Sequence, residues 1–381
     1  MEHSRHGKLV VKRSTIGKDD LATLQADWQR LEKIANGSVF TSWYWISTWL
    51  KNIDYKAKLL TVTFNQEIVG LALVVERSEN KYGNSIKQLW LNRTGDQVKD
   101  QIWNEYNDVL CAKGTEHAIR AAIINFFEQQ TIAEELIIGA SDETIQQTPI
   151  SSNVLVHTSW ATVSYSKALK PEYNELNQFL SELSVNSRQQ IKRSIKLYGG
   201  LDSIHITPAQ TADEAISLLT EAGELHKQRW KQRQSGFENP HFVSFHHQLI
   251  RDHFDNGCID VLKIKNDQRV IAYLYNFKFK GNVYFYLSGI EYCDNNKLKP
   301  GLVAHSLAIS YYANLGFKKY DFMGGEGRYK NSLSDEQSRM IISNFRRRNL
   351  PFMLSSILRK AKALYSHKNA NNNASNNANA S

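Results

Sequence analysis

"IDVLKIKNDQRVIAYLYNFKFKGNVYFYLSG", residues 259–289, contains three apolar runs that are rich in β-branched and aromatic residues. Asn266-Asp267 marks a first polar turn and Gly281-Asn282 a second, so the stretch predicts consecutive strands joined as hairpins. Residues 58–77, "KLLTVTFNQEIVGLALVVER", have the same layout, with two apolar runs around Asn65-Gln66-Glu67. The two stretches are offset by about 200 residues, which indicates a repeat.

The segments around these stretches repeat as well. Two segments with the apolar spacing of an amphipathic helix precede each stretch: residues 19–35 and 42–53, and residues 212–230 and 240–254. Another helical segment and then an apolar run follow each stretch: residues 117–130 and 135–139, and residues 302–316 and 318–324. The order helix, helix, strands, helix, strand therefore occurs twice. It predicts one α/β fold duplicated in tandem, with the join near residues 150–175.

Length and composition fit this organisation. At 381 residues the chain exceeds what one hydrophobic core usually holds, so two domains are expected. The formal net charge of +9 is compatible with an anionic ligand, nucleic acid or a membrane surface. The three cysteines form no CxxC pair, which excludes a disulfide framework and zinc-ligand spacing. The first residues contain no apolar signal segment and no run is long enough to span a membrane, so a cytoplasmic protein is expected.

The join predicts a distinctive helix. The stretch "ELNQFLSELSVNSRQQIKRSIKLYGG", residues 175–200, ends at Gly199-Gly200, a typical helix stop. Arg188, Lys192 and Lys196 follow at four-residue steps, so these three cations share one face. That face is either solvated or an anion-binding wall.

The stretch "YDFMGGEGRYK", residues 320–330, has the features of a ligand site. A short β-like run ends in Gly324, Gly325 and Gly327, and glycines let a ligand approach the backbone or allow a positive φ. Arg328, Tyr329 and Lys330 follow and offer donors to a phosphate or carboxylate. The pattern is not a P-loop, since GxxxxGK[ST] is absent. The alternative is a glycine loop that serves only a tight turn.

These segments carry a resemblance to a known family. The layout resembles a tandem pair of GNAT (Gcn5-related N-acetyltransferase) folds. In detail it resembles the GNAT-like acetyltransferases of bacterial cellulose and exopolysaccharide gene clusters, which are related to the FemABX aminoacyl transferases. The matching segments are "VFTSWYWISTWL" (39–50), "LSVNSRQQIKRSIK" (183–196), "LHKQRW" (225–230), "KPGLVAHSLAI" (299–309) and "YDFMGGEGRYK".

The resemblance implies an α/β fold with a mixed sheet in each of two GNAT-like domains. The first domain is expected over residues 1–165 and the acyltransferase domain over residues 166–345. A basic amphipathic helix is predicted for residues 346–368, with Leu354, Ile357, Leu358, Ala361 and Leu364 on one side. This helix packs on the protein body or on a membrane surface. The Asn/Ala/Ser tail, residues 369–381, is expected to be disordered.

The segment "KLKPGLVAH" is the expected donor site. Pro300 presets the first turn of a helix, Gly301 lets a ligand approach, and the helix dipole favours an anion at this end. In GNAT proteins this place holds the pyrophosphate of coenzyme A, and Lys297 and Lys299 would add positive charge. The expected cofactor-binding residues are Lys299 and the residues with free N–H groups, Gly301, Leu302, Val303 and Ala304.

The donor fingerprint departs from the usual GNAT pattern. Leu298 stands where Arg or Gln is usual, and Val303 where Gly or Ala is usual. The donor is therefore either acetyl-CoA or another acyl-CoA, or an aminoacyl-tRNA as in FemABX proteins. In the first half, "CAKGTEHAIRA" occupies the equivalent place, and Glu116 there would repel a phosphate. We therefore expect a donor site in the second half only.

Several residues are candidates for catalysis and acceptor binding. Glu326 is a candidate base for an amine, and Tyr329 a candidate acid toward the leaving thiolate. His226 shares a helix face with Arg229 and Trp230, as a base would with an anion clamp, or as a helix would that simply packs its tryptophan. The expected substrate-binding residues are Arg229, Trp230, Asp321, Gly325 and Lys330. No metal is expected, because His241, His246 and His247 lack a metal-site spacing.

The resulting prediction is an acyltransferase that moves an acyl group from acyl-CoA to an amine or hydroxyl. The acceptor would be a small-molecule, lipid-linked or nucleotide-linked sugar, or another cell-envelope or exopolysaccharide precursor. One alternative is aminoacyl transfer from tRNA. Another is a non-catalytic GNAT-like scaffold of a polysaccharide synthase.

Overall fold

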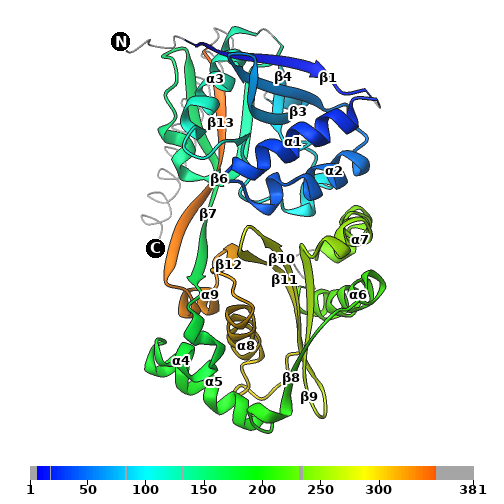
Figure 1. The fold of residues 1–381 in the computed structure, drawn as a ribbon, viewed down its shortest axis with the longest axis vertical. Helices are drawn as coiled ribbons and strands as arrows, with labels where there is room; N and C mark the ends of the chain where they lie inside the picture. Colours follow the sequence, from blue (N-terminus) through cyan, green and yellow to red (C-terminus); the bar gives the residue numbers. More distant parts are fainter. Residues whose placement is uncertain (1–6, 18, 82–83, 131, 231–234, 349–381) are drawn as a thin grey trace, which may run out of the picture.

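The computed structural model describes residues 7–17, 19–81, 84–130, 132–230 and 235–348. The first half contains β1 (Leu9–Thr15), α1 (Leu21–Ile34), α2 (Trp43–Asn52), β2 (Lys58–Phe64), β3 (Glu67–Lys81), β4 (Asn84–Leu91), β5 (Leu110–Cys111), α3 (Glu116–Gln129), β6 (Glu135–Asp142) and β7 (Val154–Ala168). The second half contains α4 (Leu176–Ser181), α5 (Val185–Leu197), β8 (Ile204–Pro208), α6 (Ala212–Arg229), α7 (Pro240–His253), β9 (Ile259–Asn266), β10 (Val270–Phe279), β11 (Asn282–Ile290), α8 (Pro300–Asn314), β12 (Lys319–Gly324), α9 (Arg328–Leu333) and β13 (Glu336–Arg347). The predicted repeat of helices and strands is present in both halves (Figure 1).

The described strands form one mixed sheet, which confirms the predicted α/β class. Its order is β1-β2-β3-β4-β6-β13-β7-β12-β11-β10-β9-β8, with β5 paired to β3. This order is symmetric about the central pair β13–β7, so each strand on one side has an equivalent on the other. Two pairs are parallel, β4 with β6 and β11 with β12, and they occupy equivalent places in the two halves.

The halves exchange a strand at the centre of the sheet. β7 follows the first half in sequence, but it lies between β13 and β12, and its last residues pair with β12. β13 follows the second half in sequence, but it lies between β7 and β6 of the first half. Figure 1 shows the two strands running together from one half into the other. The predicted domain ends at residues 165 and 345 fall inside these two strands.

Helices cover both faces of the sheet. On one face, α1 and α2 of the first half and α6 and α7 of the second share a single apolar core. Trp45 of α2 lies edge-on to Phe245 of α7, with ring centroids 4.8 Å apart, and both side chains are buried. On the other face, α3 covers the first half, while α4, α5 and α8 cover the second. The two halves therefore share one core as well as one sheet.

Two sequence predictions are corrected here. The single helix predicted within residues 175–200 is two helices, α4 and α5, because the Ser184 hydroxyl accepts the Ser187 N–H at 3.2 Å and starts a new helix. The predicted basic helix over residues 346–368 begins with strand residues, since β13 runs to Arg347. From residue 349 this helix and the predicted tail lie outside the described residues. Within the described residues, none of the helices combines the length and apolar character that a bilayer crossing requires.

The strand exchange predicts that the end of the chain stabilises the first half. Phe345 of β13 is 1% exposed and belongs to the core of the first half, so Phe345→Ala should lower the free energy of unfolding by about 3–5 kcal/mol. Urea unfolding should still show one transition, because the halves share a core. Arg339→Ala, at a position in β13 whose side chain is 56% exposed, is the control and should change stability by less than about 0.5 kcal/mol. Two separate transitions in Phe345→Ala, with the second half unaffected, would contradict this account.

Candidate functional site

β11 and β12 separate shortly after they begin to pair. Their parallel pairing covers residues 282–284 and 319–321 only. Beyond it lies a cavity of about 220 Å³. Its lining residues come from β11, β12, the start of α9 and a loop of the first half: Phe285, Tyr286, Phe322, Met323, Gly324, Lys330, Trp103 and Glu105. The cavity can hold a small reacting group between the two faces of the sheet.

The end of β12 departs from regular strand geometry at this cavity. Pairing with β7 shifts register between Asp321 and Met323, and Met323 has a φ of +59°. The Asp321 carboxylate holds this bend by accepting the Met323 N–H at 2.7 Å. A Cβ on Gly324 would come within 3.1–3.3 Å of Thr162 and Glu105, and Gly325 has a φ of +104°. Gly324 therefore allows the close approach of Thr162 and Glu105 to the backbone, and Gly325 allows the left-handed turn that follows.

Glu105 reaches this cavity from the first half of the chain. Its Oε2 accepts the Gly324 N–H at 2.7 Å. Desolvation raises the pKa of Glu105 to about 7, although the Gly324 N–H and the Lys330 charge act in the opposite direction. Its loop is strained, because Trp103 and Tyr106 both have positive φ values, 45° and 47°. A carboxylate with this pKa can accept a proton near neutral pH.

Sequence reasoning missed Glu105. It lies 219 residues before Gly324, in a loop without a recognisable motif. The only local signals are its aromatic neighbours, Trp103 and Tyr106, and these are also typical of a packed loop. The contact exists only because the exchanged strands bring the halves together.

Lys330 lies next to the same backbone. Its Nζ donates to the Gly324 carbonyl at 2.6 Å and to the Met323 carbonyl at 3.4 Å. Burial lowers the pKa of Lys330, while Glu105 and Asp321 act to raise it. The structure thus places Lys330 at the cavity, with its ammonium group beside the glycines, as part of the short helix α9.

The other predicted residues of this stretch differ in their surroundings. Tyr329 stacks on His305 of α8 with ring centroids 5.0 Å apart, and burial raises the pKa of Tyr329. His305 in turn lies against Phe285 of the cavity wall at 4.4 Å. Glu326 and Arg328 are exposed, and neither lines the cavity. Tyr329 therefore stands behind the cavity on the α8 side.

His226, Arg229 and Trp230 lie at the end of α6, outside the cavity lining. The His226 Nδ1 and the Ser235 hydroxyl are 2.7 Å apart, and burial lowers the pKa of His226 to about 4. The Arg229 guanidinium lies over the Tyr292 ring at 4.9 Å, and Trp230 is 38% exposed. Their catalytic and binding roles stay predictions.

The start of α8 is open to a ligand. A Cβ on Gly301 would meet no heavy atom within 4 Å, and Gly301 and Leu302 are partly exposed. As first-turn residues, these two have no hydrogen-bond partner for their N–H groups within the helix. The Lys299 N–H donates to the Ser194 hydroxyl of α5 at 2.9 Å and so ties the helix start to α5.

The expectation of four free N–H groups at this helix start is wrong in part. The Val303 N–H already donates to the Lys299 carbonyl at 3.0 Å, closing the first helical turn. Val303 and Ala304 are both fully buried in the core beneath the helix. Only the first part of the turn therefore faces an incoming group.

The equivalent strand separation in the first half is filled. β4 and β6 pair at residues 88–90 and 135–137 and then diverge. The Asn107 side chain bridges the diverging strands by donating to the Leu91 carbonyl at 2.8 Å and to the Gly139 carbonyl at 3.0 Å. Asn107 is itself fully buried. The protein's own loop thus occupies the place where the second half has a cavity.

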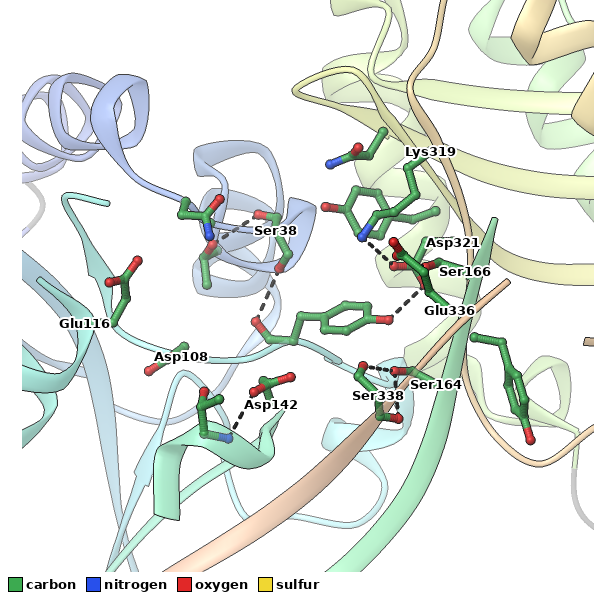
Figure 2. A pocket seen from close by; sticks show the side chains of 18 of the residues that line it. Ser38, Asp108, Glu116, Asp142, Ser164, Ser166, Lys319, Asp321, Glu336 and Ser338 are labelled. Carbon is green, nitrogen blue, oxygen red and sulfur yellow. Dashed lines mark hydrogen bonds and ion pairs between the residues drawn. The ribbon is translucent and has the colours of Figure 1, made fainter. Parts of the chain in front are cut away.

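A second, larger pocket of about 860 Å³ lies between the halves. Figure 2 shows Asp108, Glu116 and Asp142 of the first half on one side of it and Asp321 and Glu336 on the other. The Tyr106 hydroxyl donates to Asp321 at 2.8 Å across the pocket wall. Burial raises the pKa of Asp321, a predicted substrate-binding residue that is 2% exposed.

Glu105 makes stability depend on pH. Because its folded pKa of about 7 lies above the ordinary value of 4.5, its contribution to stability is complete below pH 4.5 and is lost as the pH rises through 7. Glu105→Gln lacks this loss. The melting temperature of the variant minus that of wild type should therefore increase between pH 4.5 and 7 and stay constant above pH 7. The difference corresponds to about 3 kcal/mol. Thermal melts across pH 4.5–8 measure it, with the exposed Glu326→Gln as control; parallel curves for wild type and Glu105→Gln would exclude a desolvated carboxyl.

Comparisons with known proteins agree with this architecture. Residues 185–331 match the family model of the acetyltransferase (GNAT) domain. A search of curated protein sequences gave no significant match. FemX aligns with 90% of this chain and 98% of its own, with a TM-score of 0.57 and 8% identity.

Two further solved structures align over most of the chain. A conserved protein of unknown function from Bacteroides thetaiotaomicron VPI-5482 covers 89% of this chain and 100% of its own, with a TM-score of 0.52 and 10% identity. The C-terminal domain (DUF2156) of a putative lysylphosphatidylglycerol synthetase from Agrobacterium fabrum covers 88% and 95%, with a TM-score of 0.51 and 8% identity. With the symmetric strand order and the family match, these likenesses show that the chain consists of two GNAT folds in tandem.

Proposed function

We propose that this protein transfers an acyl group from an acyl-CoA thioester to an amine, with Glu105 as the general base. The observation that carries the proposal is the Glu105 carboxylate, whose pKa is about 7, in the cavity between β11 and β12 of a GNAT fold. A base with this pKa is half deprotonated at neutral pH and can accept a proton from an attacking amine.

The acyl donor and the acceptor amine would approach the cavity from opposite faces of the sheet. The open start of α8, with its helix dipole and with Lys297 and Lys299 nearby, supports a pyrophosphate site on the face that carries α8. From there the thioester would extend between β11 and β12. Glu105 enters from the opposite face, since its neighbour Tyr106 packs against the core shared by α1, α2, α6 and α7. The acceptor amine would approach from that face.

The proposed reaction uses the side chains of Glu105, Lys330 and Tyr329. The amine nitrogen attacks the thioester carbonyl carbon, a C–N bond forms, and the amine proton passes to Glu105. The Lys330 ammonium at the cavity would stabilise the developing oxyanion. The C–S bond then breaks, and the thiolate takes a proton, for which Tyr329 is the proposed donor. The raised pKa of Tyr329 keeps its hydroxyl protonated at neutral pH.

The first half would take no donor of its own. Asn107 fills its strand separation, and Glu116 in the first turn of α3 places a negative charge where a phosphate would lie. The first half instead supplies Glu105 to the second. A sugar or other cell-envelope precursor as acceptor is supported by the family resemblance of the sequence alone.

Aminoacyl transfer from tRNA is the second candidate. The fold likeness to FemX and the exposed Lys192, Arg193 and Lys196 on α5 favour it. Calorimetry of the full chain with acetyl-CoA, longer acyl-CoAs and total tRNA separates the two. Binding to tRNA without binding to any coenzyme A derivative would replace our proposal, and binding to neither would leave only a non-catalytic scaffold.

The donor site can be tested at Gly301. Gly301→Asp should raise the Kd for acetyl-CoA by at least about tenfold, because it places a negative charge where the pyrophosphate would lie. Its melting temperature should not fall, since an Asp in the first helical turn favours the helix dipole and the added Cβ lies in open space. Gly301→Ala is the matched control and should bind acetyl-CoA within about threefold of wild type. Unchanged affinity in Gly301→Asp would move the donor elsewhere.

The general base can be tested by the pH dependence of turnover. For wild type, kcat/KM calculated for the neutral form of the amine should rise about tenfold per pH unit below 7 and level off above it, because only deprotonated Glu105 accepts the proton. Glu105→Gln should lower kcat/KM by about 10²–10⁴-fold and lose this limb. Release of free coenzyme A with a panel of amines measures the rate. Glu326→Gln is the comparison, and loss of the limb in that variant alone would identify Glu326 as the base.

A further inference from the structure

The large pocket between the halves has a strong excess of acidic groups. Six carboxylates line it: Asp108, Glu116, Asp142, Asp321, Asp335 and Glu336. The lining also contains two Lys or Arg side chains, Arg120 and Lys319, and one histidine, His117. This balance opposes the net charge of the whole chain, which is +9. At about 860 Å³ the pocket falls within the usual size range of small-molecule sites.

Both basic side chains are already engaged. Arg120 pairs with Asp108, and the Lys319 Nζ lies 3.5 Å from an Asp321 oxygen. Asp335 pairs at 3.0 Å with Lys167. Across the part of the chain that the structure describes, Glu116, Asp142 and Glu336 take part in no ion pair.

Two of these carboxylates accept hydrogen bonds from neutral groups, while Glu116 interacts through space with the Arg120 charge. Asp142 accepts the Thr144 N–H at 2.9 Å, and Glu336 accepts the Ser166 hydroxyl at 3.0 Å. The three carboxylates come from three elements on different sides of the pocket: the start of α3, the end of β6 and the start of β13. In Figure 2, Glu116 and Asp142 face Glu336 across the pocket. Spread in this way, they can meet separate positive charges of one ligand.

The pocket adjoins the cavity that contains Glu105. Tyr106 and Asp321 line the pocket, while their chain neighbours Glu105 and Phe322 line the cavity. The Tyr106 hydroxyl donates to Asp321, so the hydrogen bond joins two lining residues of the pocket beside the cavity. Tyr284, which also lines the pocket, packs in the core on the face opposite α8. A molecule in the pocket therefore lies on the side from which the acceptor would approach.

We propose that this pocket binds the acceptor and that the acceptor is a small molecule with two or more amino groups, such as a linear polyamine or a diamino sugar. The inference rests on the proposed acyl transfer. One amine, in its neutral form, would reach Glu105, and the remaining ammonium groups would pair with Glu116, Asp142 and Glu336. An anionic acceptor such as a nucleotide-sugar diphosphate would meet like charge throughout the pocket.

Binding can be measured without any acyl donor. Calorimetry of the full chain uses spermidine, 2-deoxystreptamine, the monoamine glucosamine and the anion UDP-glucose. Spermidine, with two amines more than glucosamine, should bind about tenfold more tightly than glucosamine, and 2-deoxystreptamine, with one more, about threefold to fivefold more tightly, because each further ion pair adds about fivefold or less. UDP-glucose should not bind. Whichever of spermidine and 2-deoxystreptamine binds more tightly identifies the polyamine or the amino-sugar source.

Charge-neutralising variants locate the site. Asp142→Asn and Glu336→Gln keep the hydrogen-bond acceptors of these side chains, and each should weaken spermidine binding by about threefold to fivefold. The double variant should lose about tenfold or more. Glu172→Gln, an exposed acidic position outside the pocket, is the control and should bind as wild type does. Thermal melts confirm that each variant is folded.

Two results would overturn the inference: no binding of either polyvalent amine, or binding that the double variant leaves unchanged. Preferential binding of UDP-glucose would replace it with an anionic acceptor. Acetyl-CoA binding, measured on the same preparation, reports separately on the proposed function. If acetyl-CoA binds and the amines do not, only the acceptor assignment fails; if the amines bind and acetyl-CoA does not, the proposed transfer fails and the pocket remains.

Discussion

The antiparallel pairing of β7 with β13 is the interaction on which the rest of this structure depends. Each strand completes the sheet of the half to which it does not belong in sequence, so neither half has a full sheet without the other. The pairing sets the position of one half against the other, and the shared core of α1, α2, α6 and α7 then fills the space on one face. The hydrogen bond between Glu105 and Gly324 is a consequence of this placement.

The two GNAT folds differ in what lies between their diverging parallel strands. In both halves the parallel strands separate after three pairs of residues. In the first half the buried Asn107 satisfies the freed carbonyls, so that separation is stable and closed. In the second half Glu105 and Lys330 hold backbone groups beside an open cavity. The loop of the first half thus contributes Glu105 to the cavity of the second half.

Two features of the site cost folding free energy: left-handed backbone conformations and the desolvation of Glu105. Trp103, Tyr106 and Met323 have left-handed backbone conformations, which for residues other than glycine cost of order 1–3 kcal/mol each. Glu105 loses hydration, which raises its pKa to about 7. These costs are sustained because the surrounding sheet and core fix the backbone on both sides. They place one carboxylate where it can exchange a proton at neutral pH.

The sequence by itself determined the repeat, the α/β class, the helix start at Pro300 and the glycine-rich end of β12, because hydrophobic period, turn residues and helix signals act over a few neighbouring positions. It also identified Lys330, which lies at the cavity, as a candidate site residue. Only the tertiary structure decided the strand exchange, the filled separation in the first half and the position of Glu105. Each depends on contacts between residues far apart in the chain, 219 residues for Glu105 and Gly324, and no local pattern encodes them.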